Sequence, residues 1–147
     1  LSFQKNTFRL NANGLVFRDA QDVTITDAQI RQNNEEGVVV RDGGRITVQR
    51  SNVEENQGYG IYINYCVDGD ISHNHIVENC GGVRLENMTM GFEVHDNVVA
   101  RNRCTSSQGL ARTASPASDM GLGLWVDNSA SIQVESNKIA DNGSDGV

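Results

Sequence analysis

Residues 37–63 read GVVVRDGGRITVQRSNVEENQGYGIYI, and they contain one full sequence repeat and the start of the next. Each repeat begins at a glycine that precedes an alternation of apolar and polar residues. Such glycines recur at steps of 23, 23, 22, 41 and 23 residues, at Gly14, Gly37, Gly60, Gly82, Gly123 and Gly146. A constant period of this length is typical of solenoid proteins. The step of 41 residues indicates one repeat and an insertion, which we place at about 104–121.

Three short segments of alternating hydrophobicity follow each glycine. In the quoted stretch their apolar residues are Val38 and Val40, Ile46 and Val48, and then Val53. A period of two residues is typical of β-strands. No helical crossover separates the segments, so each strand pairs with its counterpart one turn away. The sequence therefore predicts an all-β parallel solenoid of about six turns of 22–23 residues, with three strands per turn that form three parallel sheets.

Two series of polar residues recur at a fixed phase of the repeat. The first series is Asn11, Asn33, Asn56, Asn79, Asn102 and Asn142, and the second is Asn6, Ala28, Ser51, Asn74, Asn97 and Asn137. Equivalent residues stack in a solenoid, and a buried side-chain amide can then bond to the amide of the next turn. We therefore expect two polar ladders inside the solenoid, rather than asparagines that only mark exposed turns.

The sequence fits a single domain that covers residues 1–147. Leu1 and Phe3 align with Val23 and Ile25, so the chain begins inside a turn, and Gly146 starts another strand at the end. Neither end carries a segment that would cap the core, as solenoids require. We therefore expect a fragment of a longer β-helix, with flanking turns or self-association of copies at its uncapped ends.

Composition narrows the possible partners. A net charge of −7 disfavours general binding to nucleic acid, and no run of 18 apolar residues exists that could span a membrane. The cysteines, at positions 66, 80 and 104, are too few and scattered for a disulfide scaffold or a zinc site. Cys80 and Cys104 fall near each other on successive turns, and the sequence is compatible both with a bridge between them and with unpaired thiols.

The segments 37–40 (GVVV), 46–48 (ITV) and 51–56 (SNVEEN) resemble the short repeat of the right-handed parallel β-helix superfamily, which includes pectate lyases and mannuronan C5-epimerases. The resemblance covers essentially the whole chain outside the insertion. It implies a right-handed parallel β-helix and a secreted or extracellular location, including the bacterial periplasm or cell surface. The repeat residues are structural, so the resemblance specifies the fold more than the chemistry. The Asp-Pro-His-Glu motif associated with the epimerases has no match in the chain.

Outward-pointing residues of the first strand in each repeat form two ladders. One ladder is Val16, Val39, Tyr62, Arg84 and Trp125, and its neighbour is Arg18, Arg41, Asn64, Glu86 and Asp127. Enzymes of the superfamily commonly hold a sugar chain along the outside of one sheet. Aromatic rings stack on sugars, and arginines pair bidentately with carboxylates. The residues assigned to binding an acidic polysaccharide are therefore Arg18, Arg41, Asn64 and Trp125, together with Arg112 of the insertion.

If this face is catalytic, the resemblance implies β-elimination or C5 epimerisation of a uronate. Such chemistry needs a base for the C5 proton and a group that neutralises the carboxylate. Arg84 or Arg41 could neutralise the carboxylate, and Tyr62 could act as base or acid. Glu86 and Asp127 are an alternative carboxylate pair for glycoside hydrolysis. In the simpler interpretation, Arg84 only pairs with Glu86 or Asp127 across the ladder.

The histidines and acidic clusters are weaker candidates. His73 and His75 straddle Asn74, and His95 falls near the position of Ser72 on the next turn, so the imidazoles could approach one another. Surface histidines show the same spacing, so we assign no metal ligand. The acidic clusters at 68–70 and 141–145 could bind Ca²⁺, but they follow no calcium-loop pattern and are interpreted as solvated turns. We expect no cofactor.

Two function classes remain. The first is a carbohydrate-active β-helix that binds or processes an acidic polysaccharide along its first sheet. The alternative is a non-catalytic structural or adhesive β-helix segment, of the surface, tail-spike-like or self-assembling kind. The missing epimerase motif and the uncapped ends favour the alternative, whereas the aromatic and arginine residues beside the insertion favour the first, which we prefer.

Overall fold

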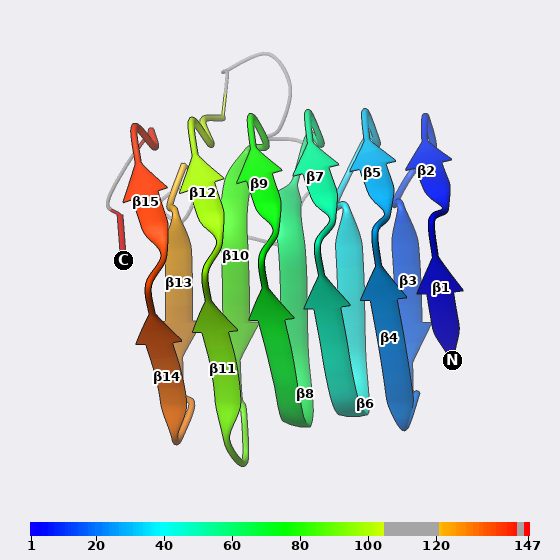
Figure 1. The fold of residues 1–147 in the computed structure, drawn as a ribbon, viewed down its shortest axis with the longest axis vertical. Coiled ribbons are helices and arrows are strands. Elements are labelled where there is room, and N and C mark those ends of the chain that lie inside the picture. Colours follow the sequence, from blue (N-terminus) through cyan, green and yellow to red (C-terminus); the bar gives the residue numbers. More distant parts are fainter. Residues whose placement is uncertain (105–120, 144–145) are drawn as a thin grey trace.

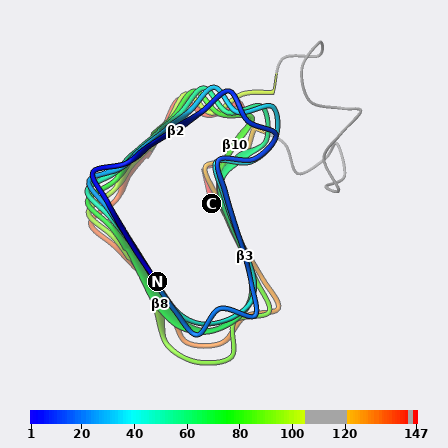
Figure 2. The same cartoon turned by 90° about the vertical axis from the view of Figure 1, so that its right-hand side faces the viewer.

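The computed structural model describes residues 1–104, 121–143 and 146–147. These residues form stacked parallel strands that wind around a common axis as a β-solenoid (Figure 1). A view along the axis shows three sides that enclose the core (Figure 2). We name these sides the first, second and third faces, in the order in which they follow each repeat glycine.

Two long strands pass through two faces each, namely β6 (Val38–Gln49) and β8 (Tyr59–Ser72). The first face also contains β3 (Leu15–Arg18), β10 (Gly81–Glu86) and β13 (Leu124–Asp127). The second face also contains β1 (Ser2–Gln4), β4 (Asp22–Thr26), β11 (Phe92–His95) and β14 (Ile132–Glu135). The third face contains β2 (Thr7–Arg9), β5 (Gln29–Arg31), β7 (Asn52–Glu54), β9 (His75–Val77), β12 (Val98–Ala100) and β15 (Lys138–Ala140).

The predicted all-β parallel solenoid is confirmed, with one difference in how the sheets are divided. The first and second faces are joined in one nine-stranded sheet, and the third face is a separate six-stranded sheet. The corner between the first two faces is short, and Gly43 pairs in register with Cys66 there, so the ladder of strand pairing continues around it. The third face has six described strands and the first has five, because residues 1–14 cross only the second and third faces.

The alternating apolar residues fill the inside of the solenoid. Ile25, Ile46, Ile61 and Phe92 are fully buried. Removing one such side chain from water stabilises the fold by about 1.5–3 kcal/mol. The second face lacks an inward side chain at Gly69 because Phe92 of the next turn occupies that space, and a Cβ on Gly69 would clash with the ring. A small residue on one turn therefore accommodates a large one on the next.

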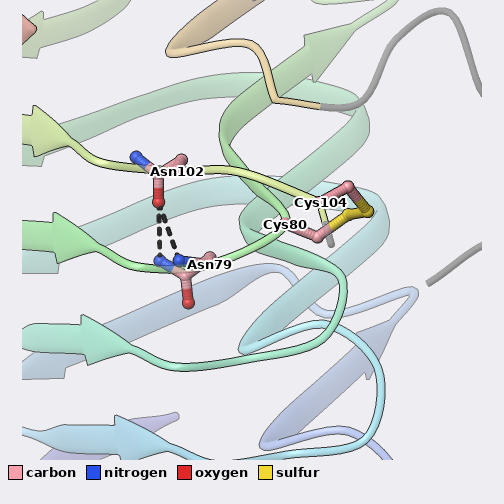
Figure 3. Close-up of a disulfide and its surroundings, with 4 residues drawn as sticks. All are labelled: Asn79, Cys80, Asn102 and Cys104. Carbon is pink, nitrogen blue, oxygen red and sulfur yellow. Dashed lines mark hydrogen bonds between the residues drawn. A yellow bond between two sulfur atoms is a disulfide. The ribbon is translucent and has the colours of Figure 1, made fainter. Parts of the chain in front are cut away.

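Both predicted polar ladders are present. The Asn79 side-chain nitrogen donates to Asn102 Oδ1 at 3.1 Å (Figure 3). It also donates to the carbonyl of Val53 at 2.9 Å, and Asn79 Oδ1 accepts a bond of 2.9 Å from the side chain of Asn56. The second ladder is similar, since Asn74 donates to Asn97 Oδ1 at 3.1 Å. Each ladder side chain in the middle of the stack is fully bonded, which removes the cost of burying it.

The repeat glycines are required because the ladder packs against them. A Cβ on Gly60 would lie 2.7 Å from Ile76 Cγ2 and 3.0 Å from Asn79 Nδ2. Real Cβ atoms do not approach other atoms this closely, so the repeat has no room for a side chain here. The glycine series and the asparagine series are thus two parts of one packing arrangement.

A disulfide joins Cys80 and Cys104, which lie one turn apart beside the Asn79–Asn102 pair (Figure 3). The sequence alone was compatible with either a bridge or two unpaired thiols. In the structure, the stacking of turns brings the two Cα atoms to a separation of 4.1 Å. Cys66 is a free thiol in the core, and burial raises its pKa to about 11. It is therefore a packing residue rather than a reactive thiolate.

Candidate functional site

The structure confirms the register of the two outward ladders on the first face. Tyr62 of β8 pairs with Arg84 of β10, and Arg84 pairs with Trp125 of β13. The neighbouring ladder follows the same order, since Arg18 of β3 pairs with Arg41 of β6. The pairing of β10 with β13 joins residues on the two sides of the insertion. Arg112, assigned to this face from the sequence, lies outside the described residues.

Arg84 is held between aromatic rings on neighbouring strands. Its guanidinium carbon lies 5.4 Å from the Tyr62 ring centre and 5.0 Å from the Trp125 ring centre, with the Tyr59 ring at 5.6 Å. The whole residue is only 9% exposed. Cation–π contacts of this kind are strongest where water is excluded.

The charge of Arg84 is already neutralised by a residue of its own strand. Its Nε donates to Glu86 Oε1 at 2.8 Å, and a second bond runs from Nη2 to the same oxygen. The simpler interpretation of the sequence, in which Arg84 pairs with Glu86 or Asp127, is confirmed for Glu86, which lies two residues along β10. Arg84 and Glu86 therefore form a nearly buried pair, and an added carboxylate would have to compete with Glu86.

Tyr62 belongs to the same network. Its hydroxyl donates to Glu86 Oε2 at 2.9 Å and accepts a bond of 3.2 Å from the Asn64 side chain. Burial and the bond to Glu86 raise the pKa of Tyr62 above its usual value. The phenol therefore remains protonated near neutral pH, which makes it a hydrogen-bond donor and disfavours its predicted role as a base.

Two arginines of the first face lie beside this network. Arg41 lies 5.7 Å from the Tyr62 ring centre, and its Nε is buried with no hydrogen-bond partner among the residues that the structure describes. Arg18, on the neighbouring strand, is exposed. Asp127 is exposed at the other end of the ladder, and Trp125 is partly exposed. The part of this face with available cationic groups is therefore around Arg18 and Arg41 rather than around Arg84.

The sequence did not single out two further residues of this face. Tyr59 is buried beside Arg84 although it points away from the core, and Glu36 is half-buried near Arg41 and Arg84. Burial raises the pKa of the Glu36 carboxyl. The signal that could have identified them is their shared phase, since each directly precedes a repeat glycine.

The corner between the second and third faces contains a second group of titratable residues. His73 and His95 stack edge to face with ring centres 5.8 Å apart, and Asp96 lies against both rings. The bond to Asp96 is the main cause that raises the pKa of His95. His75 is not part of this group. The sequence suggested an approach of the histidines but missed Asp96.

The acidic cluster at 68–70 is engaged by neighbouring turns. Asp68 forms an ion pair of 3.1 Å with Arg45, and Asp70 accepts hydrogen bonds from Gln49 and Ser72. Both acids line a groove of about 330 Å³ on the second face. Residues 144 and 145 of the acidic cluster at 141–145 lie outside the described residues.

A larger groove of about 460 Å³ lies at the corner that follows the third face. Glu55, Glu78, Arg103 and the disulfide line it, and none of the described candidate residues of the first face does. In the described ranges, no helix is long and apolar enough to cross a membrane.

Comparison with known proteins supports the fold and leaves the chemistry open. A search of curated proteins gave no match, and neither did a search of solved structures. A family model described as "right handed beta helix region" matches residues 1–117, which is most of the chain. The repeat, the parallel strand stack and this match agree, and the chain belongs to the right-handed β-helix family.

Proposed function

We propose that this β-helix binds an acidic polysaccharide of the uronate type along the outside of its first face. The observation that carries the proposal is the position of Arg18 and Arg41 on adjacent strands, with the Tyr62 ring beside Arg41 and Trp125 further along the same face. A polymer with a carboxylate on each sugar meets cationic and aromatic groups on successive strands, which are about 4.8 Å apart.

Arg41 is the central contact of the proposed site. Its Nε is buried, but the residue as a whole is partly exposed, so a sugar carboxylate would bind the terminal Nη1 and Nη2 groups of the guanidinium in a bidentate manner. The Tyr62 ring fixes one side of the guanidinium, so little conformational freedom is lost on binding. Trp125 offers a partly exposed ring on which a sugar can stack.

We propose binding without catalysis on this face. β-Elimination and epimerisation require a base, and Tyr62 is a protonated donor to Glu86 with a raised pKa. Glu86 is occupied by both Tyr62 and Arg84, so it is poorly placed to transfer a proton to a glycosidic oxygen. These contacts stabilise the surface, and they leave the reactive groups of the ladder engaged with one another.

We also propose that the protein works outside the reducing cytosol. The Cys80–Cys104 bridge supports this, because such bonds persist in secreted, periplasmic and cell-surface proteins. An acidic polysaccharide of a cell wall or matrix would be available there.

Affinity electrophoresis tests the binding proposal. Gels that contain alginate or polygalacturonate should retard the wild-type protein, and gels with neutral dextran should not. Arg41→Ala should weaken binding by about tenfold, which corresponds to about 1.4 kcal/mol. Trp125→Ala should also weaken it, while Arg101→Ala, which removes an exposed arginine from another part of the solenoid, should leave it unchanged.

Unchanged mobility of the wild-type protein in both acidic gels would contradict the proposal and leave the structural or adhesive alternative. Catalysis is measured separately, as ultraviolet absorbance of unsaturated uronate products. An increase in that absorbance that depends on Tyr62 would overturn the non-catalytic part of the proposal.

A further inference from the structure

The histidine pair between the second and third faces has the composition of a metal site. His73 and Asp96 occupy equivalent corner positions on adjacent turns, because His95 pairs with Ser72. One ligand atom from each of His73, His95 and Asp96 lies within 4.8 Å of the other two. Two imidazoles and a carboxylate are typical ligands of Zn²⁺ and related transition metals, whereas Ca²⁺ prefers oxygen alone.

The distances within the cluster suit a tetrahedral ion. Asp96 Oδ2 lies 2.8 Å from His95 Nδ1 and 3.9 Å from His73 Nε2. Zinc with bonds of about 2.0–2.1 Å separates its ligand atoms by about 3.4 Å, which lies between these two values. The His73 and Asp96 side chains are 59% and 47% exposed, so small rotations can equalise the distances without disturbing the core.

A second observation supports a metal ligand at His95. Asp70 lies on the adjacent strand, and its Oδ1 is 3.2 Å from His95 Nε2, on the opposite side of the ring from Asp96. Asp70 Oδ1 is buried and makes no aligned hydrogen bond in the described structure. Gln49 and Ser72 hold the other oxygen of this carboxylate in place. A carboxylate behind a histidine fixes the ring and leaves its other nitrogen free for a metal.

We propose that His73, His95 and Asp96 bind one divalent transition-metal ion of the zinc type, and that Asp70 orients His95. The site has three protein ligands and opens to solvent, so water or a ligand of another molecule completes the coordination. It lies on a different face from Arg41 and Trp125, and it is independent of the proposed polysaccharide site.

Calorimetric titration of tag-free protein with zinc chloride at pH 7.5 tests the proposal. The expected result is one ion per chain, bound with micromolar affinity and not displaced by millimolar Ca²⁺. His73→Ala and His95→Ala should each weaken binding by about tenfold or more. His75→Ala is the matched control, because His75 is also exposed but lies outside the cluster, and it should bind as the wild type does.

Asp70→Asn separates an orienting role from a ligand role. It should weaken zinc binding by about tenfold while the stoichiometry stays at one. Circular dichroism checks that each variant is folded. The proposal is overturned if the wild type binds no zinc at millimolar concentration, if His73→Ala binds zinc as well as the wild type, or if His75→Ala loses as much affinity as His73→Ala. The first of these results would mean that the contacts of His95 with Asp70 and Asp96 serve only to hold this corner of the solenoid.

Discussion

The inner asparagine ladder and the outer ladder of the first face repeat with the same period but are built differently. Inside, Asn79 bonds to an identical residue on each neighbouring turn. Outside, Tyr62, Arg84 and Trp125 are three different residues that contact one another through ring faces and a shared carboxylate. The asparagine ladder needs the same residue on successive turns, whereas the outer ladder only needs side chains that can stack on one another.

In a solenoid, the outer positions can vary with function, whereas the inner positions are determined by the fold. An inner position is fixed by the need to satisfy every buried polar atom, so its residue carries information about the fold. An outer position has no such constraint, so a local group of aromatic and charged residues needs another explanation. On the first face the explanation that we propose is ligand binding.

The largest expected effect comes from interrupting the inner ladder. Asn79→Ala leaves the buried backbone N–H of Asn56 without its acceptor and removes one of the two donors to Asn102 Oδ1, so it should lower the free energy of unfolding by about 3 kcal/mol. Asn52→Ala is the control, since Asn52 makes one outer hydrogen bond to Gln29, and it should cost less than about 0.5 kcal/mol. Urea unfolding of both variants measures the difference, and equal losses would refute the distinction between the ladders.

A smaller effect is expected from the outer ladder. Arg84→Ala removes the partner of Glu86 in a pair whose side chains are only 11% and 13% exposed. The free energy of unfolding should fall by about 2 kcal/mol. Arg101→Ala removes an exposed pair with Glu78 and should cost about 0.5 kcal/mol or less. If the two arginine variants unfold at the same urea concentration, Arg84 is not a structural residue and its pairing with Glu86 is not maintained in solution.

The smallest effect is a change in titration. Burial and the negative Glu86 raise the pKa of Tyr62, and the positive charges of Arg84 and Arg41 lower it. Glu86→Gln removes a raising cause and frees Arg84 from its partner, so the pKa of Tyr62 should fall. Carbon-13 NMR of labelled tyrosine rings can follow this titration. A pKa that stays constant or rises would show that Tyr62 does not bond to Glu86.

Much of the fold follows from the sequence, because residues at one phase of the repeat must stack. The pairings of Phe3 with Ile25 and Phe8 with Ile30 could be predicted from the phase alone. The same reasoning gave both outer ladders correctly. A period determines which residues are neighbours on adjacent turns, and this information is independent of side-chain conformation.

Contacts within a turn could not be predicted in this way. The sequence offered Glu86 and Asp127 as alternative partners of Arg84, and the period could not choose between them, because the choice depends on side-chain conformation along one strand. The corners limit prediction in another way, because His73 and Asp96 share a phase on adjacent turns but adopt left-handed backbone conformations with φ of 58° and 55°. Such conformations are uncommon for residues other than glycine, so the direction of these side chains could not be predicted from the phase.

An NMR titration with a short oligogalacturonate is the most direct test of ligand binding by the first face, because it locates the ligand on the solenoid. Backbone amide shifts should change around residues 16–18, 39–41, 62–64 and 125–127, and those of the third face should stay constant. Shift changes that concentrate on β5, β7 and β9, or that remain unaltered in Arg41→Ala, would contradict the assignment of ligand binding to the first face.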